Sequence, residues 1–461
     1  MDRGSSHPRL GALVGLLVAA GCTAAAEGES DTASEPCDDL VGPGFAIVAG
    51  GPYVGGFPCG DINGDGLDDV VVHTASTTAY VVFGKADPAP VVLADLAPAE
   101  GFEIRYASGD LEVFPAGDIN GDGFDDLALA FAGQIRVLPG GAESASWVLD
   151  AGDASPPLVL EGGGNYSVGD WIAAAGDVNG DGFDDLLVNH AEPYFSTTHV
   201  IFGDDAPEFY TPEELAADVG GIAIVAYGGV NVAGDVNGDG IDDLAVVSSR
   251  GPFEQGFDGV DVVFGGPTLH SLEYNPDEPP SFDGYAIRVD GASISLSADG
   301  GEDVDGDGRA DFVIADEYSD GPMWVLYGKA GVDAVHLPDD LSDETGFPIL
   351  TGTTPEAWPW LRLLPDLDGD GHAEIEIYLG GEAYVVRGKA DGATVDLAAV
   401  ALGEGGYARS DRAWAHGLTL PRALSWAEID GAPGLDAVVS VPPGPGSPVG
   451  CTYVYFAPPD R

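Results

Sequence analysis

Basic residues are scarce in this sequence, and their scarcity excludes one large class of function. The 461 residues include 16 Lys and Arg against 78 Asp and Glu, so the formal net charge is −62. Nucleic-acid binding needs a cationic face that displaces the counterions of the phosphates. No nucleic-acid partner is therefore expected.

Long apolar runs and catalytic motifs are missing as well. The apolar run at residues 10–20 has eleven residues, which is too short for a membrane-spanning helix. The sequence has no HExxH, GxSxG, SxxK or Walker-type motif, and no CxxC or Cys/His spacing typical of zinc sites. We therefore expect that the chain is not an enzyme.

Apolar and turn-forming residues are abundant. Hydrophobic residues make up 44% of the chain, enough for a sizeable core despite the charge. The 70 glycines and 34 prolines imply many turns and hence many short strands. The composition indicates a globular protein built from strands.

The first residues have the features of an export signal. Arg3 and Arg9 precede the apolar run, and residues 18–22, VAAGC, resemble the lipobox of bacterial lipoproteins. This resemblance implies a signal peptide at 1–21, lipidation of Cys22, and a lipid-anchored protein of the bacterial cell envelope, at the outer membrane or cell surface. The alternative is an ordinary cleavable signal beside an unrelated cysteine. Residues 22–40 are small and polar, which predicts a flexible tether.

An acidic, glycine-rich cassette recurs seven times. GDINGDGLDDV at residues 60–70 returns with small changes, and its first acidic residues are spaced 57 to 68 residues apart. We number the cassettes 1 to 7 and count positions from these residues: Asp61, Asp118, Asp177, Asp235, Asp303, Asp366 and Glu428. Seven units of about sixty residues therefore fill residues 41–461.

Each unit also carries the same strand pattern. An apolar stretch follows the cassette, then a strand that ends in glycine, such as YVVFG at residues 80–84, and then another extended segment. With the short strand before the cassette, each unit supplies four strands. Seven four-stranded units predict an all-β fold, a seven-bladed β-propeller.

The cassette and its glycine-ended strand resemble the FG-GAP repeat of integrin α-subunit propellers and of bacterial secreted proteins. The resemblance covers residues 41–461 and implies a propeller with FG-GAP-type calcium loops. The GAP tripeptide is not kept, since HTA stands at residues 73–75 and NHA at 189–191. The fold is therefore expected to be shared, whereas the ligand preference is left open.

The two ends of the chain are expected to meet. The last unit has three strands, and residues 45–50, FAIVAG, match the fourth strand of the other units. We therefore expect this N-terminal strand to complete the last blade beside residues 453–456. After lipidation of Cys22 three thiols remain, one of them unpaired, and Cys37–Cys451 and Cys37–Cys59 are the pairings left open.

The cassette spacing indicates a calcium loop. Side-chain oxygens at positions 1, 3, 5 and 9, a carbonyl at 7 and a glycine at 6 suit a hard cation with six to eight ligands. The expected ligands are Asp61, Asn63, Asp65, Leu67 and Asp69; Asp118, Asn120, Asp122, Phe124 and Asp126; Asp177, Asn179, Asp181, Phe183 and Asp185; Asp235, Asn237, Asp239, Ile241 and Asp243; Asp303, Asp305, Asp307, Arg309 and Asp311; and Asp366, Asp368, Asp370, His372 and Glu374.

Cassette 7 is damaged. Ala432 stands where the position-5 ligand should be, and Pro433 replaces the turn glycine, although Glu428, Asp430 and Asp436 remain. We therefore expect about six calcium ions, with a structural role, and an empty seventh loop.

A ligand surface is expected on the face opposite the calcium loops. The loops there carry aromatic and cationic residues typical of recognition surfaces: Tyr194, Phe195, Arg250, Phe253 and Tyr318. The alternative is that these side chains pack against neighbouring loops. We expect a binding, adhesion or scaffolding module with a protein or glycan ligand; the rival hypothesis is a carbohydrate-binding or polysaccharide-degrading protein on the same fold.

Overall fold

The computed structural model describes most of the chain after the N-terminal region. The described residues are 44–49, 55–75, 77–106, 108–142, 145–149, 158–161, 171–191, 196–205, 210–226, 228–248, 259–273, 282–289, 296–316, 322–351, 360–379, 382–410, 424–432, 436–441 and 451–456. The expected signal peptide and tether, with Cys22 and Cys37, lie outside them. In the described part, no helix is long and apolar enough to cross a membrane.

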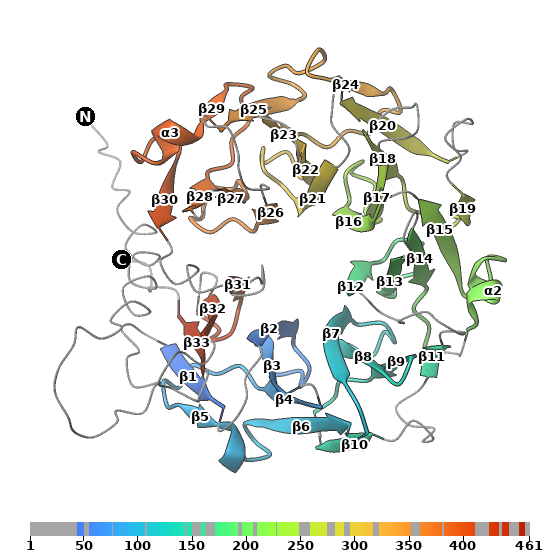
Figure 1. Ribbon diagram of the computed structural model, residues 1–461, viewed down its shortest axis with the longest axis vertical. Coiled ribbons are helices and arrows are strands. Elements are labelled where there is room, and N and C mark those ends of the chain that lie inside the picture. The colour runs from blue at the N-terminus through green and yellow to red at the C-terminus, as the bar shows by residue number, and fades with distance from the viewer. Residues whose placement is uncertain are drawn as a thin grey trace.

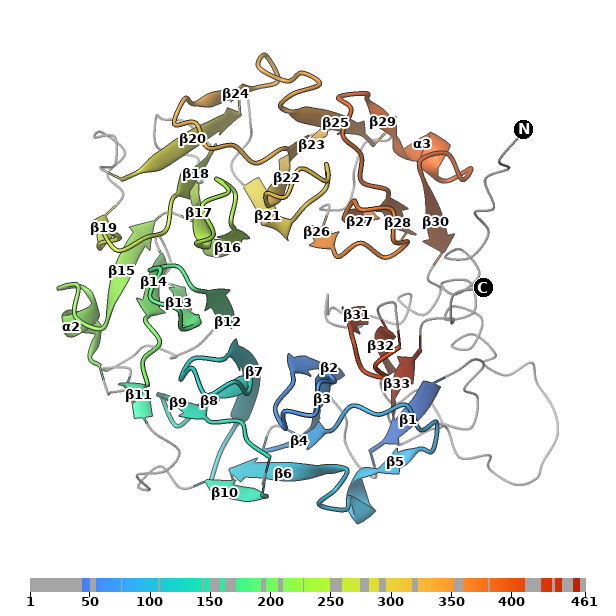
Figure 2. The same cartoon turned by 180° about the vertical axis from the view of Figure 1, so that it is seen from behind.

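The described residues form seven separate sheets that stand around a ring (Figures 1 and 2). The strand nearest the centre of each is β2 (Gly55–Gly60), β7 (Leu111–Gly117), β12 (Trp171–Gly176), β16 (Val230–Gly234), β21 (Leu296–Glu302), β26 (Trp360–Leu364) or β31 (Leu424–Ala427). The second strands are β3 (Asp69–Ala75), β8 (Asp126–Phe131), β13 (Asp185–Ala191), β17 (Asp243–Ser248), β22 (Asp311–Asp316), β27 (Glu374–Leu379) and β32 (Asp436–Val441).

The sheets continue outward with antiparallel strands. Third in each sheet are β4 (Thr78–Val82), β9 (Gln134–Leu138), β14 (Ser196–Ile201), β18 (Gly259–Val263), β23 (Met323–Leu326), β28 (Glu382–Val386) and β33 (Cys451–Tyr455). Fourth are β6 (Gly101–Tyr106), β11 (Leu158–Glu161), β15 (Gly221–Ala226), β20 (Gly284–Val289), β25 (Gly346–Leu350), β30 (Gly406–Ser410) and, in the sheet of β31–β33, β1 (Gly44–Val48). The short helices are η1 (Leu93–Asp95), α2 (Pro212–Leu215) and α3 (Leu397–Val400).

Five sheets carry an additional outer strand that the sequence pattern did not predict. It comes from the segment that follows the third strand of the next unit, and it pairs in parallel with the fourth strand. These strands are β5 (Val91–Val92), β10 (Trp147–Leu149), β19 (Leu272–Glu273), β24 (Val335–Leu337) and β29 (Val395–Asp396). A single parallel bridge between Leu160 and Tyr210 makes the same connection at a sixth junction. Each such unit is thereby hydrogen-bonded to the one before it.

The apolar core lies between neighbouring sheets. Every side chain of β8 is buried, and the two faces of the strand contribute to different clusters. Leu127, Leu129 and Phe131 pack with the sheet of β2, whereas Ala128 and Ala130 pack with the sheet of β12. Successive side chains on a strand point to opposite faces, so a strand covered on both faces must be apolar throughout. This explains the continuous apolar stretches after each cassette.

The predicted pairing of the chain ends is confirmed. β1 lies antiparallel to β33, with Gly44 opposite Tyr455 and Val48 opposite Cys451. Phe45 of β1 is fully buried and its ring centroid lies 5.9 Å from that of Phe456. The N-terminal strand therefore belongs to the same sheet as the last three strands.

The states of Cys59 and Cys451 exclude one of the two expected disulfide pairings. Cys451 is disulfide-bonded. Cys59 is a buried free thiol on β2, so the Cys37–Cys59 pairing is wrong. The physical reason is that Cys59 faces the core between the sheets of β2 and β7, packed among apolar side chains. Cys37, the partner in the remaining alternative, lies outside the described residues.

The β1–β33 pairing can be tested with Phe45→Ala. Removing a fully buried phenyl ring should lower the free energy of unfolding by about 3–5 kcal/mol. The matched control is Leu402→Ala, because Leu402 is 84% exposed and its loss should cost no more than about 0.5 kcal/mol. Urea denaturation followed by tryptophan fluorescence measures both. Equal midpoints for the two variants would contradict a buried β1.

Candidate metal-binding loops

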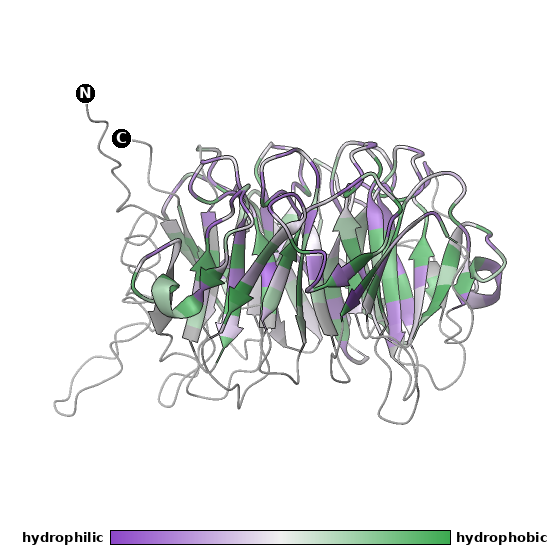
Figure 3. Cartoon of the chain, turned by 90° about the horizontal axis from the view of Figure 1, so that it is seen from above, coloured by the Kyte–Doolittle hydropathy of each residue, from purple (hydrophilic) through white to green (hydrophobic). Residues whose placement is uncertain are grey.

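The cassettes connect the first and second strands of the sheets, so they lie together on one face of the ring. Loops collect at the two ends of the strands, as the side view shows (Figure 3). Hydrogen bonds between successive cassettes confirm that they adjoin one another; for example, the Asp125 amide of cassette 2 donates to the Asp61 carbonyl of cassette 1 at 3.2 Å.

The position-1 aspartate organises the loop in cassettes 1 and 3 to 6. The Asp61 carboxylate accepts hydrogen bonds from the amides of Gly64, Asp65 and Gly66 at 2.7, 3.0 and 2.7 Å. The same three-bond arrangement recurs around Asp177, Asp235, Asp303 and Asp366. Glycine at position 6 has a φ of +87° in cassette 1, a conformation that glycine adopts without strain. The D-x-[ND]-G-D-G spacing thus follows from the shape of the turn.

The position-9 carboxylate is the buried group of each loop. Asp69 is fully buried, and its two oxygens accept from the Ile62 amide at 3.1 Å and the Gly84 amide at 2.8 Å. The same position is fully buried in every cassette: Asp126, Asp185, Asp243, Asp311, Glu374 and Asp436. In cassette 6 one of these oxygens, Glu374 Oε1, has no hydrogen-bond partner. A buried carboxylate without full compensation calls for a positive charge.

The glycine that ends the third strand has a defined role. Gly84 donates its amide to Asp69, and a Cβ there would lie 2.6 Å from the Asp68 carbonyl oxygen and 3.0 Å from that of Ile429. The first distance is shorter than real Cβ contacts allow, and the second is tighter than most of them. Larger residues are therefore excluded where the strand meets its own cassette and the preceding one.

Burial raises the pKa of the position-9 acids. For Asp69 the pKa rises to about 8, because of desolvation and the neighbouring charges of Asp65 and Asp61. Desolvation likewise raises the pKa to about 8 for Asp185, Asp311 and Glu374, and to about 7 for Asp126 and Asp243. Without a cation, these carboxylates hold protons near neutral pH.

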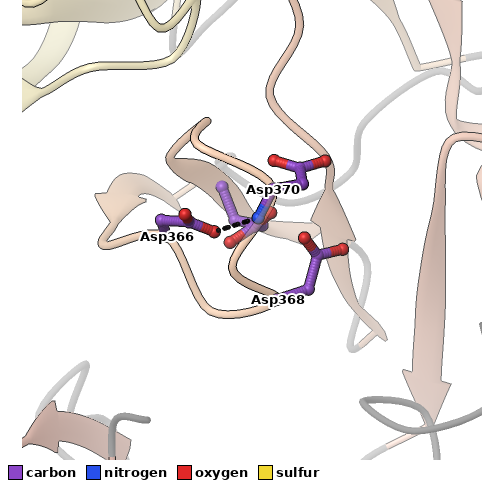
Figure 4. A group of neighbouring side chains, drawn as sticks. Asp366, Asp368 and Asp370 are labelled. Atoms are coloured by element: carbon purple, nitrogen blue, oxygen red, sulfur yellow. Dashed lines mark hydrogen bonds between the residues drawn. The ribbon is translucent and has the colours of Figure 1, made fainter. Parts of the chain in front are cut away.

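The predicted ligands converge most clearly in cassette 6. Oxygens of Asp366, Asp368, Asp370 and Glu374 all lie within 4.8 Å of one another, and the three aspartates surround one space in Figure 4. Oxygens of Asp303, Asp305 and Asp307 in cassette 5 converge in the same way. Such a set of carboxylate oxygens fits a hard cation such as calcium.

Arginines approach the ligand sets of these two cassettes. Arg309, at position 7, lies 2.5 Å from the Asp307 carboxylate. Arg387 lies 3.2 Å from the Asp368 carboxylate and stands where four other units have Phe or Tyr before glycine. Each therefore offsets part of the negative charge in its loop.

Position-7 side chains lie over the preceding cassette. A Cβ on Gly64 would be 2.3 Å from the Phe124 ring, so only glycine leaves room for it. The corresponding pairs are Phe183 on Gly121, Ile241 on Gly180, Arg309 on Gly238, His372 on Gly306 and Leu67 on Gly431. Leu67, Phe124, Phe183, Ile241, Arg309 and His372 were predicted to act through their carbonyls only, and their packing role was missed.

Cassette 7 keeps part of the loop. Asp436 accepts from the amides of Ile429 and Asp430, both at 2.9 Å, and Asp430 accepts from the Ala432 amide at 2.7 Å. Glu428 is exposed, and Pro433 lies outside the described residues. The turn is thus supported although it lacks one side-chain ligand.

The role of the position-8 aspartate, which bonds to the preceding cassette, was not predicted from the sequence. The Asp125 carboxylate accepts from the Asp61 amide at 2.7 Å, while the Asp125 amide donates to the Asp61 carbonyl at 3.2 Å. Asp184, Asp242 and Asp68 make the same two bonds to Asp118, Asp177 and Glu428 of the preceding cassettes. The available signal was an acid at position 8 in the first four cassettes and alanine in the next two.

The predicted ligand face lies on loops between the described strands. Tyr194, Phe195, Arg250, Phe253 and Tyr318 all lie outside the described residues. Their grouping stays a prediction.

Comparison with known families supports the repeat assignment. The model of the FG-GAP repeat matches residues 169–194, which contain cassette 3. The predicted FG-GAP resemblance is thus confirmed. A comparison with curated protein sequences finds no match.

Several solved structures have a similar fold. The crystal structure of BBS1N in complex with ARL6DN shares 10% identity, with a TM-score of 0.43 over 89% of this chain and 95% of that chain. The Dos1 propeller shares 9% identity, with a TM-score of 0.34 over 91% and 95%. The exotype rhamnogalacturonan lyase YesX shares 14% identity, with a TM-score of 0.31 over 90% and 65%. Likeness at this level supports no inference about ligands or activity.

The raised pKa values predict how the metal-free protein responds to pH. A carboxyl whose pKa is higher in the folded than in the unfolded state stabilises the fold below its unfolded pKa and loses that effect as pH rises through its folded pKa. For Asp69 this window runs from the ordinary aspartate pKa of 3.8 to about 8. The melting temperature of the metal-free protein should therefore decrease as the pH is raised from about 5 to about 8.5. Scanning calorimetry after chelating-resin treatment measures it, and a rise across this range would contradict the burial of these acids.

Proposed function

We propose that this chain is a seven-bladed propeller in which six cassettes each bind one calcium ion. The observation that carries the proposal is the buried position-9 carboxylate placed beside two or three further acids in a tight turn. In cassette 1 the ligands are Asp61, Asn63, Asp65, the Leu67 carbonyl and Asp69, and cassettes 2 to 6 use the equivalent positions. Oxygen donors in an irregular loop suit calcium better than magnesium, which retains its water.

Calcium has a structural role in this proposal. Bound calcium supplies the positive charge that the crowded carboxylates of each turn otherwise lack. The chain prepares the turn itself: Asp61 holds three loop amides, and Asp69 ties the loop to Ile62 and Gly84. The loops thereby fix the first two strands of each blade.

The seven sheets are the blades in this proposal, and the shared sheet of β1 and β31–β33 closes the ring. Closure is supported by the β1–β33 pairing and by the apolar clusters between successive sheets. A closed ring protects the apolar faces of all its blades, which no blade can do alone.

We propose that the chain works by binding or scaffolding, with a protein or glycan ligand, and not by catalysis. The acids of the cassettes serve as calcium ligands or hold neighbouring loops in this proposal, and the sequence has no HExxH, GxSxG, SxxK or Walker-type motif. The strong negative charge disfavours anionic partners. With lipid attached to Cys22, the propeller would be displayed at the bacterial cell envelope, as the lipobox-like residues 18–22 suggest.

The calcium proposal predicts six ions per chain. Native mass spectrometry of residues 23–461 should find about six, because six cassettes keep every side-chain ligand. Asp65→Ala, which removes the position-5 ligand of cassette 1, should lower the number by one. The matched control is Asp430→Ala in cassette 7, which should leave the number unchanged. Two or fewer ions on the unmodified chain would disprove the proposal.

The anchoring proposal is tested by lipid labelling in a bacterial host. Labelled palmitate should enter the unmodified protein and not Cys22→Ala, which should accumulate as an uncleaved precursor. Since Cys59 is a buried thiol, Cys59→Ala is the matched control and should label normally. Equal labelling of the Cys22→Ala variant would overturn the assignment.

A further inference from the structure

The backbone of each position-1 ligand is held by the next cassette. In cassette 1, both the amide and the carbonyl of Asp61 are bonded to Asp125 of cassette 2, at 2.7 and 3.2 Å. Asp125 stands directly before Asp126, the position-9 acid of its own loop. One residue thus touches two predicted metal loops in neighbouring sheets.

The contact between Asp125 and Asp61 leaves room only for glycine at the position before Asp61. Gly60 precedes Asp61, and a Cβ on it would lie 2.3 Å from Asp125 Oδ2. Gly117 and Gly176 stand in the same relation to Asp184 and Asp242, at 2.2 and 2.0 Å. Each of these glycines also has a positive φ, between +67° and +82°. The three junctions are therefore built alike.

Cassettes 5 and 6 lack half of this link. Their position-8 residues are Ala310 and Ala373, whose amides still donate to the carbonyls of Asp235 and Asp303 at 3.0 and 2.8 Å. An alanine has no carboxylate to receive the amide in return. The two-bond link thus joins cassettes 1 to 4 in sequence and stops there.

Cassettes 1 to 6 have four acids each, but the position of one of these acids differs between cassettes 1 to 4 and cassettes 5 and 6. Cassettes 1 to 4 have Asn at position 3 and Asp at position 8, whereas cassettes 5 and 6 have Asp305 and Asp368 at position 3 and Ala at position 8. An acid that bonds to the neighbouring cassette is thus replaced by an acid that belongs to its own ligand set. The two groups of loops differ in how they are connected, while the number of acids is the same.

We propose that Asp125, Asp184 and Asp242 are positioning residues that couple the first four calcium sites, while the sites of cassettes 5 and 6 fill independently. The inference rests on the proposed calcium function. When calcium orders one loop, position 8 of that loop is fixed, and through its two bonds it fixes the backbone of the position-1 ligand in the preceding loop. The preceding site is then already ordered and binds calcium more tightly, which is positive coupling.

Asp68 provides a matched control within the chain. It makes the same pair of bonds, accepting from the Glu428 amide at 2.9 Å and donating to the Glu428 carbonyl at 2.7 Å. Its partner belongs to cassette 7, the loop expected to be empty. Asp68→Ala therefore removes an identical link without separating two calcium sites.

The test is a calcium titration followed by native mass spectrometry, which counts the ions on each molecule. In the unmodified protein the four coupled sites should fill together, while cassettes 5 and 6 add at most two further ions. Totals of zero to two and of four to six ions should therefore be populated, and the three-ion species should be scarce. Asp125→Ala/Asp184→Ala/Asp242→Ala should still reach six ions, but with all intermediate species populated and the first four affinities lowered about fivefold or more. Asp68→Ala should keep the cooperative pattern of the unmodified protein.

The outcomes separate this inference from the calcium proposal. If the unmodified protein binds no calcium, the proposed function fails and the inference fails with it. If six ions bind but the triple variant has the same species distribution as the unmodified protein, the coupling alone is overturned. If the triple variant does not fold, the single variant Asp125→Ala replaces it, because alanine stands naturally at this position in cassette 5 as Ala310. This variant should still populate partly filled species. An unchanged species distribution in it would overturn the coupling.

Discussion

The structure depends on one buried carboxylate per repeat. At position 9 the acid is completely removed from solvent, and in cassettes 1, 3, 4 and 5 its oxygens bind the backbone at two points that are distant along the chain. For Asp69 these are Ile62 at the start of the cassette and Gly84 after the third strand. A single side chain thus fixes the turn, the second strand and the end of the third strand. Losing such a group would leave several buried amides without acceptors.

The geometry around this carboxylate explains why the repeat can be recognised in the sequence. A turn of glycines in the left-handed region, an acid that collects three amides and a strand-ending glycine all need particular residue types at fixed offsets. The apolar stretches are fixed by burial on both faces of the sheets. Cassette positions, four strands per unit and the pairing of β1 with β33 could therefore be predicted from the sequence.

Other features have no local signal. The parallel outer strands, such as β5 and β19, are two or three residues long, and their pairing depends on a partner in the preceding repeat. Asp125 and Asp126 look equivalent as sequence, although one bonds across the junction and the other lies inside its own loop. Cys59 could be excluded from a disulfide only when its place in the core was known. Relationships between repeats were thus less predictable than those within a repeat.

The outer strands give the ring a direction of assembly. Repeats 2 to 6 each place a segment on the repeat made before it, so during synthesis each of these units can secure its predecessor. The sheet that contains β1 is the exception, because its other strands are the last to be made. Contacts at that joint connect residues as far apart as Gly56 and Ser440, 384 positions along the chain. Such distant pairing is slow to form. The edge of β1 that pairs with β33 must therefore wait for the end of the chain, and a truncated product would leave that edge unpaired and open to association with other chains.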